Sequence, residues 1–268
     1  MSSAPAKKVA QEATASKPLR GLARTGFAVN GLMHVVIGLV AIRIATGSGG
    51  EADQSGAFAQ IAAAPGGPFI LWVIVIGMVA LGVWLILAAF LIPGADPKRK
   101  WAHRGAEFAK GVVYLALGAT AFSFARGGST NSVTTSKTFS ATLLSAPGGA
   151  ILLVVLGLAV IAIGGYFIVK GATRKFRQDI RVSSGAAGKA TVVLGIVGYI
   201  AKGVALCVVG ILVVVAALLA NPSQSTGLDG ALRTFAALPF GSWIVGAIGV
   251  GLVAYGLYSF ARARLARL

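Results

Sequence analysis

Cysteine, histidine and acidic residues are scarce in this sequence. Its 268 residues include one Cys, two His and seven Asp or Glu. The single Cys207 excludes an intramolecular disulfide and a CxxC metal site. No HExxH, GxSxG or Walker sequence occurs, and no acidic pair has a spacing suited to acid/base catalysis. We therefore expect no metal, no cofactor and no enzymatic activity.

Charge of either sign is absent from long stretches of the chain. Hydrophobic residues make up 56% of it and charged residues 12%, with a mean hydropathy of +0.84. About 20 apolar residues cross a hydrocarbon core as a helix, because lipid satisfies no backbone polar group. Six stretches qualify, at about 25–45, 69–92, 106–125, 150–169, 192–220 and 240–260. The sequence thus predicts an all-α integral membrane protein with six transmembrane helices.

The N-terminal residues lack an apolar core of the kind a cleavable signal peptide needs. Residues 1–24 are hydrophilic, so we expect the first span to act as its own uncleaved insertion signal. The composition of residues 1–22 is too polar and small to pack, which predicts a disordered basic cytoplasmic tail.

Basic residues are concentrated on alternate connections between the spans. Those connections and the termini carry Lys7, Lys8, Lys17, Arg20, Arg24, Lys98, Arg99, Lys100, Arg104, Lys170, Arg174, Lys175, Arg177, Arg181, Lys189, Arg262, Arg264 and Arg267. The other loops hold Arg126, Lys137 and Arg233 beside Glu51, Asp53 and Asp229. By the positive-inside rule both termini are cytoplasmic. The net charge of +17 then reflects orientation and attraction to anionic headgroups, and nucleic-acid binding is not implied.

Three internal repeats follow from a recurring set of residues. Asn30-Gly31, Lys110-Gly111 and Lys202-Gly203 are each followed seven residues later by Gly38, Gly118 and Gly210. Pro65, Pro147 and Pro239 come next, and seventeen residues after each proline stand Gly82, Gly164 and Gly256, with Trp84, Tyr166 and Tyr258 two further on. We place the repeats at 23–97, 98–182 and 183–268. Each contains two spans, so the repeats are parallel and suit a pseudo-threefold arrangement.

The recurring glycines predict close helix packing, because small residues let backbones approach in lipid. Each outer loop also has a short segment before its proline: SGAFAQIAAAP, KTFSATLLSAP and LDGALRTFAALP. These segments predict three short interfacial helices, with Ser55 or Asp229 as candidate N-caps and the proline as the stop.

These features carry a resemblance to a known family. LARTGFAVNG, FAKG and GYIAKG open the odd helices, and AYGLY, after LDGALRTFAALPFG, closes the last repeat. Over about residues 20–265 the chain resembles the bacterial family called domain of unknown function 1206. Asn30 departs from the basic residue that the family pattern places in the first repeat. The resemblance implies the fold and the topology, and it supplies no activity. We expect a multi-pass protein of the bacterial cytoplasmic (plasma) membrane.

Few ionisable residues lie within the spans, and such residues are functional candidates. They are His34, Arg43, Glu107, Lys110 and Lys202. We expect Arg43 to extend toward Glu51 and Asp53 at the surface, and Glu107 to pair with Lys110 three residues on. Asn30, Lys110 and Lys202 are equivalent in the repeats, and His34 and Tyr114 lie one turn further along the same faces. If the faces converge, these five residues bind an anion or lipid headgroup; if they face lipid, the lysines only extend to the surface.

Two function classes remain open. One is a non-enzymatic scaffold or accessory protein that binds membrane lipids, protein partners or further copies of itself. The other is a small transporter or channel for an anionic or amphipathic solute along the pseudo-axis, an analogy of fold alone. No span contains a proline, a device that transporters often use.

Overall fold

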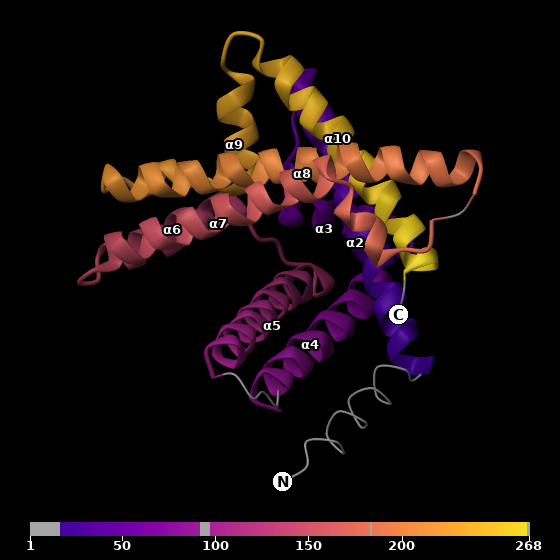
Figure 1. Ribbon diagram of the computed structural model, residues 1–268. Helices are drawn as coiled ribbons and strands as arrows, with labels where there is room; N and C mark the ends of the chain where they lie inside the picture. The colour runs from indigo at the N-terminus through magenta and orange to yellow at the C-terminus, as the bar shows by residue number, and fades with distance from the viewer. Residues whose placement is uncertain (1–16, 92–96, 183, 267–268) are drawn as a thin grey trace. The chain divides into compact units, whose positions relative to one another are not determined.

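The computed structural model describes residues 17–91, 97–182 and 184–266, which form nine α-helices and two short 3₁₀ helices (Figure 1). In chain order these are α2 (Lys17–Ala45), α3 (Gln54–Ala63), α4 (Gly67–Leu91), α5 (Pro97–Ala125), α6 (Ser132–Leu144), α7 (Gly149–Ala172), η1 (Lys175–Asp179), α8 (Ala186–Leu218), η2 (Pro222–Gln224), α9 (Gly227–Ala236) and α10 (Gly241–Leu265).

Six helices have the length and apolar composition to cross a membrane, as predicted. Their candidate spans are Arg24–Ala45, Gly67–Leu87, Glu107–Ala125, Gly149–Ala172, Ala186–Leu218 and Gly241–Leu265. The all-α multi-pass fold is therefore confirmed. Helix α8 begins earlier than the predicted span of 192–220 and contains 33 residues. At 1.5 Å per residue it is about 50 Å long.

The predicted N-terminal tail differs in part from the structure. Helix α2 begins at Lys17, so residues 17–22 are helical, and the remainder of the tail, 1–16, lies outside the described residues. Pro18 stands in the first turn, where backbone N–H groups have no partner within the helix, so it suits a helix start.

The short helices α3, α6 and α9 link the two long helices of each repeat and end just before Pro65, Pro147 and Pro239. Their caps differ from the prediction. Asn131 caps α6 by accepting the Thr134 N–H at 2.9 Å, and Asp53 accepts the Gly56 N–H at 3.0 Å at the start of α3. Ser55 and Asp229 both lie inside helices rather than at N-caps.

The chain divides into two compact units. The smaller unit contains residues 58–130, with helices α4 and α5, and the first residues of α2. The larger unit contains residues 27–57 and 131–266, with the rest of α2 and helices α6 to α10.

In the smaller unit, α4 and α5 pack through opposed glycines. A Cβ added to Gly82 would lie 3.0 Å from the carbonyl oxygen of Gly111, and one on Gly111 would lie 2.8 Å from that of Gly82. Gly118, the other predicted packing glycine of α5, faces Val79. The backbones therefore approach to a distance that no larger residue at Gly82 or Gly111 would permit without displacement.

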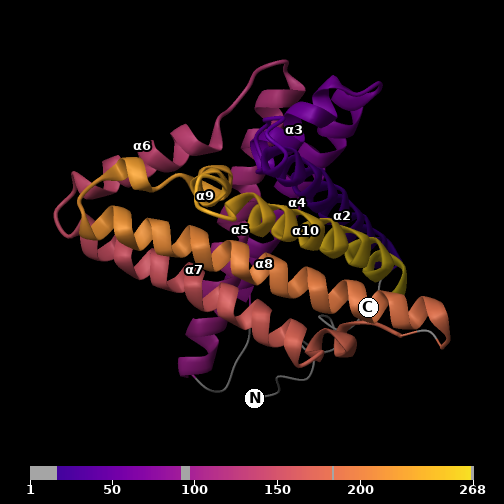
Figure 2. The same cartoon turned by 90° about the horizontal axis from the view of Figure 1, so that it is seen from above.

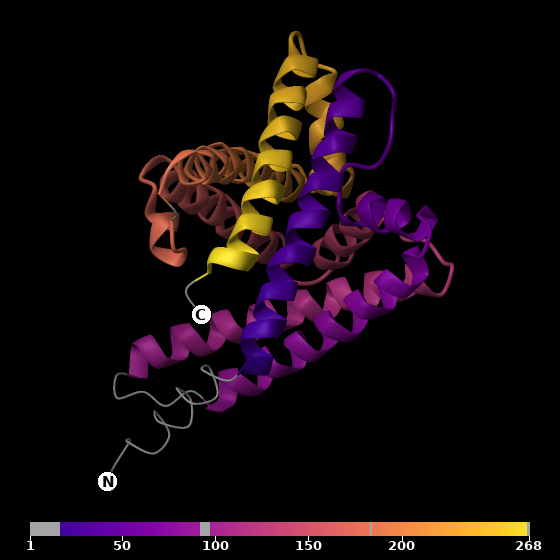
Figure 3. The same cartoon turned by 90° about the vertical axis from the view of Figure 1, so that its right-hand side faces the viewer.

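In the larger unit, two further helix pairs repeat this arrangement. Helices α7 and α8 run side by side (Figures 1 and 2) and oppose Gly164 to Gly203 and Gly157 to Gly210. Helices α2 and α10 do the same (Figure 3), opposing Gly31 to Gly256 and Gly38 to Gly249. Gly157 and Gly249 were missed in the sequence, although each stands seven residues before a predicted packing glycine.

The three pairings share one rule. In each, the second helix of one repeat packs on the first helix of the next, and α10 of the third repeat packs on α2 of the first. Helix α8 also contacts α10, where a Cβ on Gly251 would meet Ala201 and one on Gly198 would lie 2.5 Å from the Tyr255 Cα. The larger unit is thus held by close backbone contacts.

Candidate functional site

The predicted site residues belong to two different units. Lys110 and Tyr114 lie on α5 in the smaller unit. The Lys110 Nζ lies 2.7 Å from Glu107 Oε1, and its side chain is 57% exposed. This ammonium has a carboxylate partner one turn away on its own helix.

Asn30, His34 and Lys202 come together around one side chain, Tyr255 of α10. The His34 ring centroid lies 4.7 Å from that of Tyr255, and the Lys202 Nζ lies 4.3 Å from it. The Asn30 amide donates to Ser259 Oγ at 3.1 Å, and this hydroxyl donates to the Tyr255 carbonyl at 2.9 Å. Three of the five predicted residues therefore share one site, built from α2, α8 and α10.

Lys202 is held by aromatic rings. Its ammonium lies 5.2 Å from the centroid of Phe167 as well as 4.3 Å from that of Tyr255. Within the described part of the chain no Asp or Glu oxygen lies within 4.0 Å of Lys202 Nζ. Such cation–π contacts contribute about 0.5–2 kcal/mol each, so they replace part of the hydration that Lys202 has lost.

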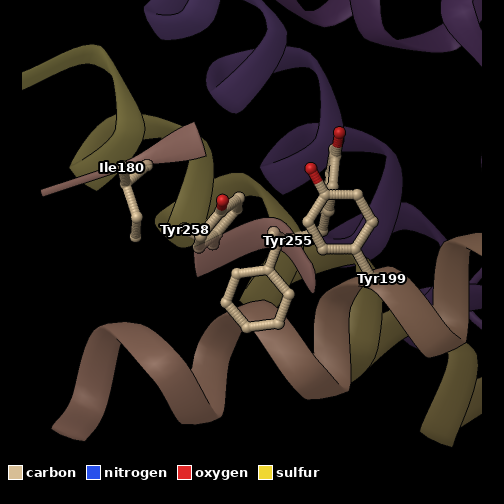
Figure 4. Close-up of a cluster of buried hydrophobic side chains, with 5 residues drawn as sticks. Ile180, Tyr199, Tyr255 and Tyr258 are labelled. Carbon is tan, nitrogen blue, oxygen red and sulfur yellow. The ribbon is translucent and has the colours of Figure 1, made fainter. Parts of the chain in front are cut away.

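A buried aromatic cluster adjoins this lysine. It consists of Phe176, Ile180, Tyr199, Tyr255 and Tyr258, all at most 5% exposed (Figure 4). Tyr199 lies at its centre, with ring centroids 5.4 Å from Phe176, 5.2 Å from Tyr255 and 5.5 Å from Tyr258. The contact with Phe176 is stacked and the other two are edge-to-face, and both geometries add to the hydrophobic stabilisation of the rings.

Sequence reasoning missed the part of this cluster that comes from the α7–α8 connection. Its basic residues predict only a cytoplasmic loop, yet Phe176 and Ile180 in it are fully buried. Ile180 pairs with Ala266, and the Arg181 N–H donates to the Leu265 carbonyl at 2.8 Å, so the connection is tied to the end of α10. Two apolar residues four apart in ATRKFRQDIRV were the available signal.

Charged side chains cover the outer edge of the aromatic cluster. Asp179 Oδ2 lies 2.7 Å from Lys170 Nζ and 3.9 Å from Arg262 Nη2. The Arg262 guanidinium lies 4.2 Å from the ring centroid of Phe27, and Lys170 Nζ lies 5.4 Å from that of Tyr199. Around this edge, one carboxylate faces two cations, with Lys202 as a third cation nearby.

A second polar group joins the three loops that link the helices within the repeats. Asp229 accepts the Ala52 N–H at 2.8 Å and Arg233 Nε at 2.8 Å, and Arg233 also donates to the Gly50 carbonyl. Glu51 accepts the Asn131 amide at 2.7 Å. We call this group, residues 50–56, 131–132 and 229–233, the loop junction.

Burial changes the acidity of two carboxyls at the loop junction. Desolvation raises the pKa of Asp53, helped by Asp229 and opposed by hydrogen bonds from Gly56, Ser132 and Ser55. Desolvation also raises the pKa of Glu51, helped by Asp53 and Asp229. Both carboxyls therefore favour the neutral form more than exposed ones do.

The expected partners of Arg43 are engaged at the loop junction instead. Asp53 is 1% exposed and accepts backbone N–H groups, while Glu51 pairs with Asn131. In the ranges covered by the structure, neither carboxylate forms an ion pair with Arg43. The same ranges contain no group of three or more His, Cys, Asp or Glu placed to hold a metal ion.

Comparisons with known proteins agree with the repeats. The profile of the family described as Domain of Unknown Function (DUF1206) matches three times, at residues 25–91, 107–174 and 197–266. The chain is also 28% identical over 261 residues to the uncharacterized protein YxxB of Bacillus subtilis (strain 168), covering 94% of this chain and 92% of that protein. No solved structure matches it. Since the three profile matches fall one to a repeat and together span most of the sequence, the chain belongs to the DUF1206 family.

Proposed function

We propose that this protein is a non-enzymatic accessory protein of the bacterial cytoplasmic membrane that binds an anionic lipid beside its aromatic cluster. One observation carries the proposal. The Lys202 ammonium rests on Tyr255 and Phe167, and no described carboxylate lies within 4.0 Å of it.

The depth of Lys202 explains why a countercharge is favourable there. Lys202 stands sixteen residues before the end of α8 at Leu218, which is about 24 Å along the helix. In a hydrocarbon core of roughly 30 Å, this leaves it about one turn from the opposite boundary. A cation at this depth is costly, and a headgroup phosphate within reach of the side chain offsets that cost.

A groove on α2 and α10, two of the three helices that build the site, favours a lipid rather than a free anion as the ligand. It lies along α2 and α10, has a volume of about 470 Å³, and is lined by Ala28, Phe260, Ala261, Ala263 and Arg264. Its walls are almost entirely apolar, and Arg264 stands at the end of α10. An acyl chain suits these apolar walls.

The proposed orientation places both termini and the α7–α8 connection in the cytoplasm. The distribution of Lys and Arg supports it. The attachment of that connection to the end of α10 also supports it, because Arg181 and Leu265 must then share one side of the membrane.

The packing of the larger unit favours binding over transport of a solute between its helices. Helices α2, α8 and α10 approach through backbone atoms at Gly31, Gly198 and Gly256. A solute path between them requires these contacts to open. We therefore prefer an accessory role to the transporter alternative.

The test is retention of anionic phospholipid in native mass spectrometry. Protein extracted with phosphatidylglycerol is compared for the wild type, Lys202→Gln and Lys189→Gln. Lys189 is an exposed lysine on the same helix and serves as the matched control. We expect Lys202→Gln to weaken retention about tenfold, equal to ~1.4 kcal/mol, and Lys189→Gln to have little effect. Equal retention in all three proteins would refute the proposal.

A further inference from the structure

The edge of the aromatic cluster contains more hydrogen-bond donors than its single carboxylate can satisfy. Tyr258 is 0% exposed, and among the described residues its hydroxyl forms no hydrogen bond of normal length; Tyr199 is only a weak partner. The Nε of Arg262 is also buried and unpartnered there. Polar groups buried in proteins are nearly always paired, so two such atoms in one place indicate an acceptor that this part of the chain does not supply.

The two donors lie next to each other. Tyr258 and Arg262 are four residues apart on α10 and so project from one face of it. The charges of Asp179 and Arg262 both act on the Tyr258 hydroxyl. Lys170 joins them from α7, since its ammonium and the Arg262 guanidinium share Asp179 Oδ2, at 2.7 and 3.9 Å.

The Asp179 carboxylate satisfies this group only in part. Its oxygen lies at hydrogen-bond distance from Lys170, whereas 3.9 Å from Arg262 Nη2 is too long for a hydrogen bond. A phosphate presents several acceptor oxygens, and arginine donors match phosphate geometry well. We propose that Lys170, Tyr258 and Arg262 form a phosphate-binding site, and that Asp179 competes with the phosphate for it.

The position of the site suits a lipid headgroup. Arg262 stands 21 residues after the start of α10 at Gly241, and Lys170 stands 21 residues after the start of α7 at Gly149. Both distances are about 32 Å along the helix, close to the thickness of a hydrocarbon core. The cations therefore reach the headgroup layer, with Lys202 deeper on the same side.

The mode of competition follows from where Asp179 lies. It ends η1, in the connection whose Phe176 and Ile180 are anchored in the aromatic cluster. The carboxylate is 30% exposed, so it can turn away from Lys170 while these anchors stay in place. A phosphate then gains both cations without unfolding the connection, and it reaches the buried Tyr258 hydroxyl once the side chains that cover it move.

Two conservative substitutions test this site, which rests on the proposed lipid-binding function. Tyr258→Phe removes the hydroxyl and keeps the buried ring. Because that hydroxyl has only a weak partner in Tyr199, its loss should leave the lipid-free protein about as stable, while phosphatidylglycerol retention should fall about three- to tenfold. Asp179→Asn removes the competing charge, and retention should rise by a similar factor.

The outcomes separate the phosphate site from the proposed function. Unchanged retention in either Tyr258→Phe or Asp179→Asn would overturn the phosphate site, even where Lys202→Gln weakens retention and the proposed function stands. Weakening by Tyr258→Phe but not by Lys202→Gln would keep the phosphate site and remove the role of Lys202. Tyr166→Phe is the control, since Tyr166 is an exposed tyrosine on α7 that is not among the proposed donors.

The source of the phosphate is distinguished with a second probe. Inorganic phosphate is titrated into lipid-free Asp179→Asn protein by calorimetry, in parallel with phosphatidylglycerol in nanodiscs. Binding of both probes assigns the site to the phosphate group itself, and binding of phosphatidylglycerol alone assigns it to a lipid headgroup. Binding of neither would overturn the inference.

Discussion

Gly164 of α7 and Gly203 of α8 face each other so closely that a Cβ on either would lie 2.6–2.7 Å from the carbonyl oxygen of the other. Gly165, the next residue along α7, has no such neighbour, because a Cβ there would meet no atom within 4 Å. The same substitution at these two adjacent glycines therefore has different consequences.

We expect Gly164→Ala to destabilise the protein by about 1–3 kcal/mol, because the added methyl must push the helices apart. Gly165→Ala should be neutral or stabilising, since alanine is the better helix former by up to about 1 kcal/mol. Thermal unfolding in detergent measures both. Equal melting temperatures for the two variants would mean that α7 and α8 do not touch at Gly164.

The proposed orientation is checked by cysteine labelling in a Cys207→Ala background. A cysteine at Ser129, in the exposed turn after α5, should react with an impermeant thiol reagent added to intact cells. A cysteine at Ser184, in the exposed connection before α8, should react only after the cells are opened. The reverse pattern would invert the topology.

The loop junction should lose stability as the pH rises. Burial raises the pKa of Asp53 above its ordinary value of 3.8, so the folded protein binds more protons than the unfolded chain as the pH rises from about 3.8 through the folded pKa. Stability is therefore greatest below 3.8 for this group and decreases through that window. Glu51 acts in the same direction; the charge of Asp229 acts on both carboxyls, and that of Arg233 acts on Glu51.

Asp53→Asn should make the melting temperature less dependent on pH between about 4 and 7. The pH dependence that remains should be the part contributed by Glu51. Thermal unfolding in detergent across this range gives the two slopes. A slope as steep in Asp53→Asn as in the wild type would show that Asp53 does not titrate in this window.

Phe176 should hold the α7–α8 connection against the helices. Its ring is fully buried and would overlap a Cβ at Gly195, so Phe176→Ala leaves a cavity and should cost about 3–5 kcal/mol locally. The connection contains Arg174, Lys175, Arg177 and Arg181, all exposed, so its release should speed trypsin cleavage. Phe139→Ala, at a half-exposed ring on α6, is the control. Cleavage at the wild-type rate would contradict the anchoring role.

The spans and the short linking helices could be predicted because their signals are local. Long runs without charge and a proline at each linking-helix end are read from neighbouring residues, and the structure follows them closely. The limits of α2 and α8 were less predictable. Small residues and a lysine that continue a helix beyond the apolar run look like the start of a loop, as at residues 186–190.

The site was only partly predictable because it depends on contacts between distant residues. Periodicity put Asn30, His34 and Lys202 on equivalent faces, but it does not say which helix those faces meet. Tyr255 meets them because α10 lies against both α2 and α8. Phe176 and Ile180 stand among many basic residues, so the segment was expected to be an exposed loop. Two large apolar side chains in such a loop nevertheless indicate that it packs against the helices.

The pairing of α10 with α2 has a consequence for how the chain can be ordered. The second helix of each repeat packs on the first helix of the next repeat, and the second helix of the third repeat packs on the first helix of the first. The helix pairs therefore do not depend on which repeat begins the chain. A circularly permuted gene that begins at residue 98, with the natural ends joined by a linker, would keep every glycine-to-glycine pair. A gene shortened to the first two repeats would keep the α4–α5 pair but would leave α7 without α8 and α2 without α10, so the loss of one repeat exposes a glycine face on each of its two neighbours.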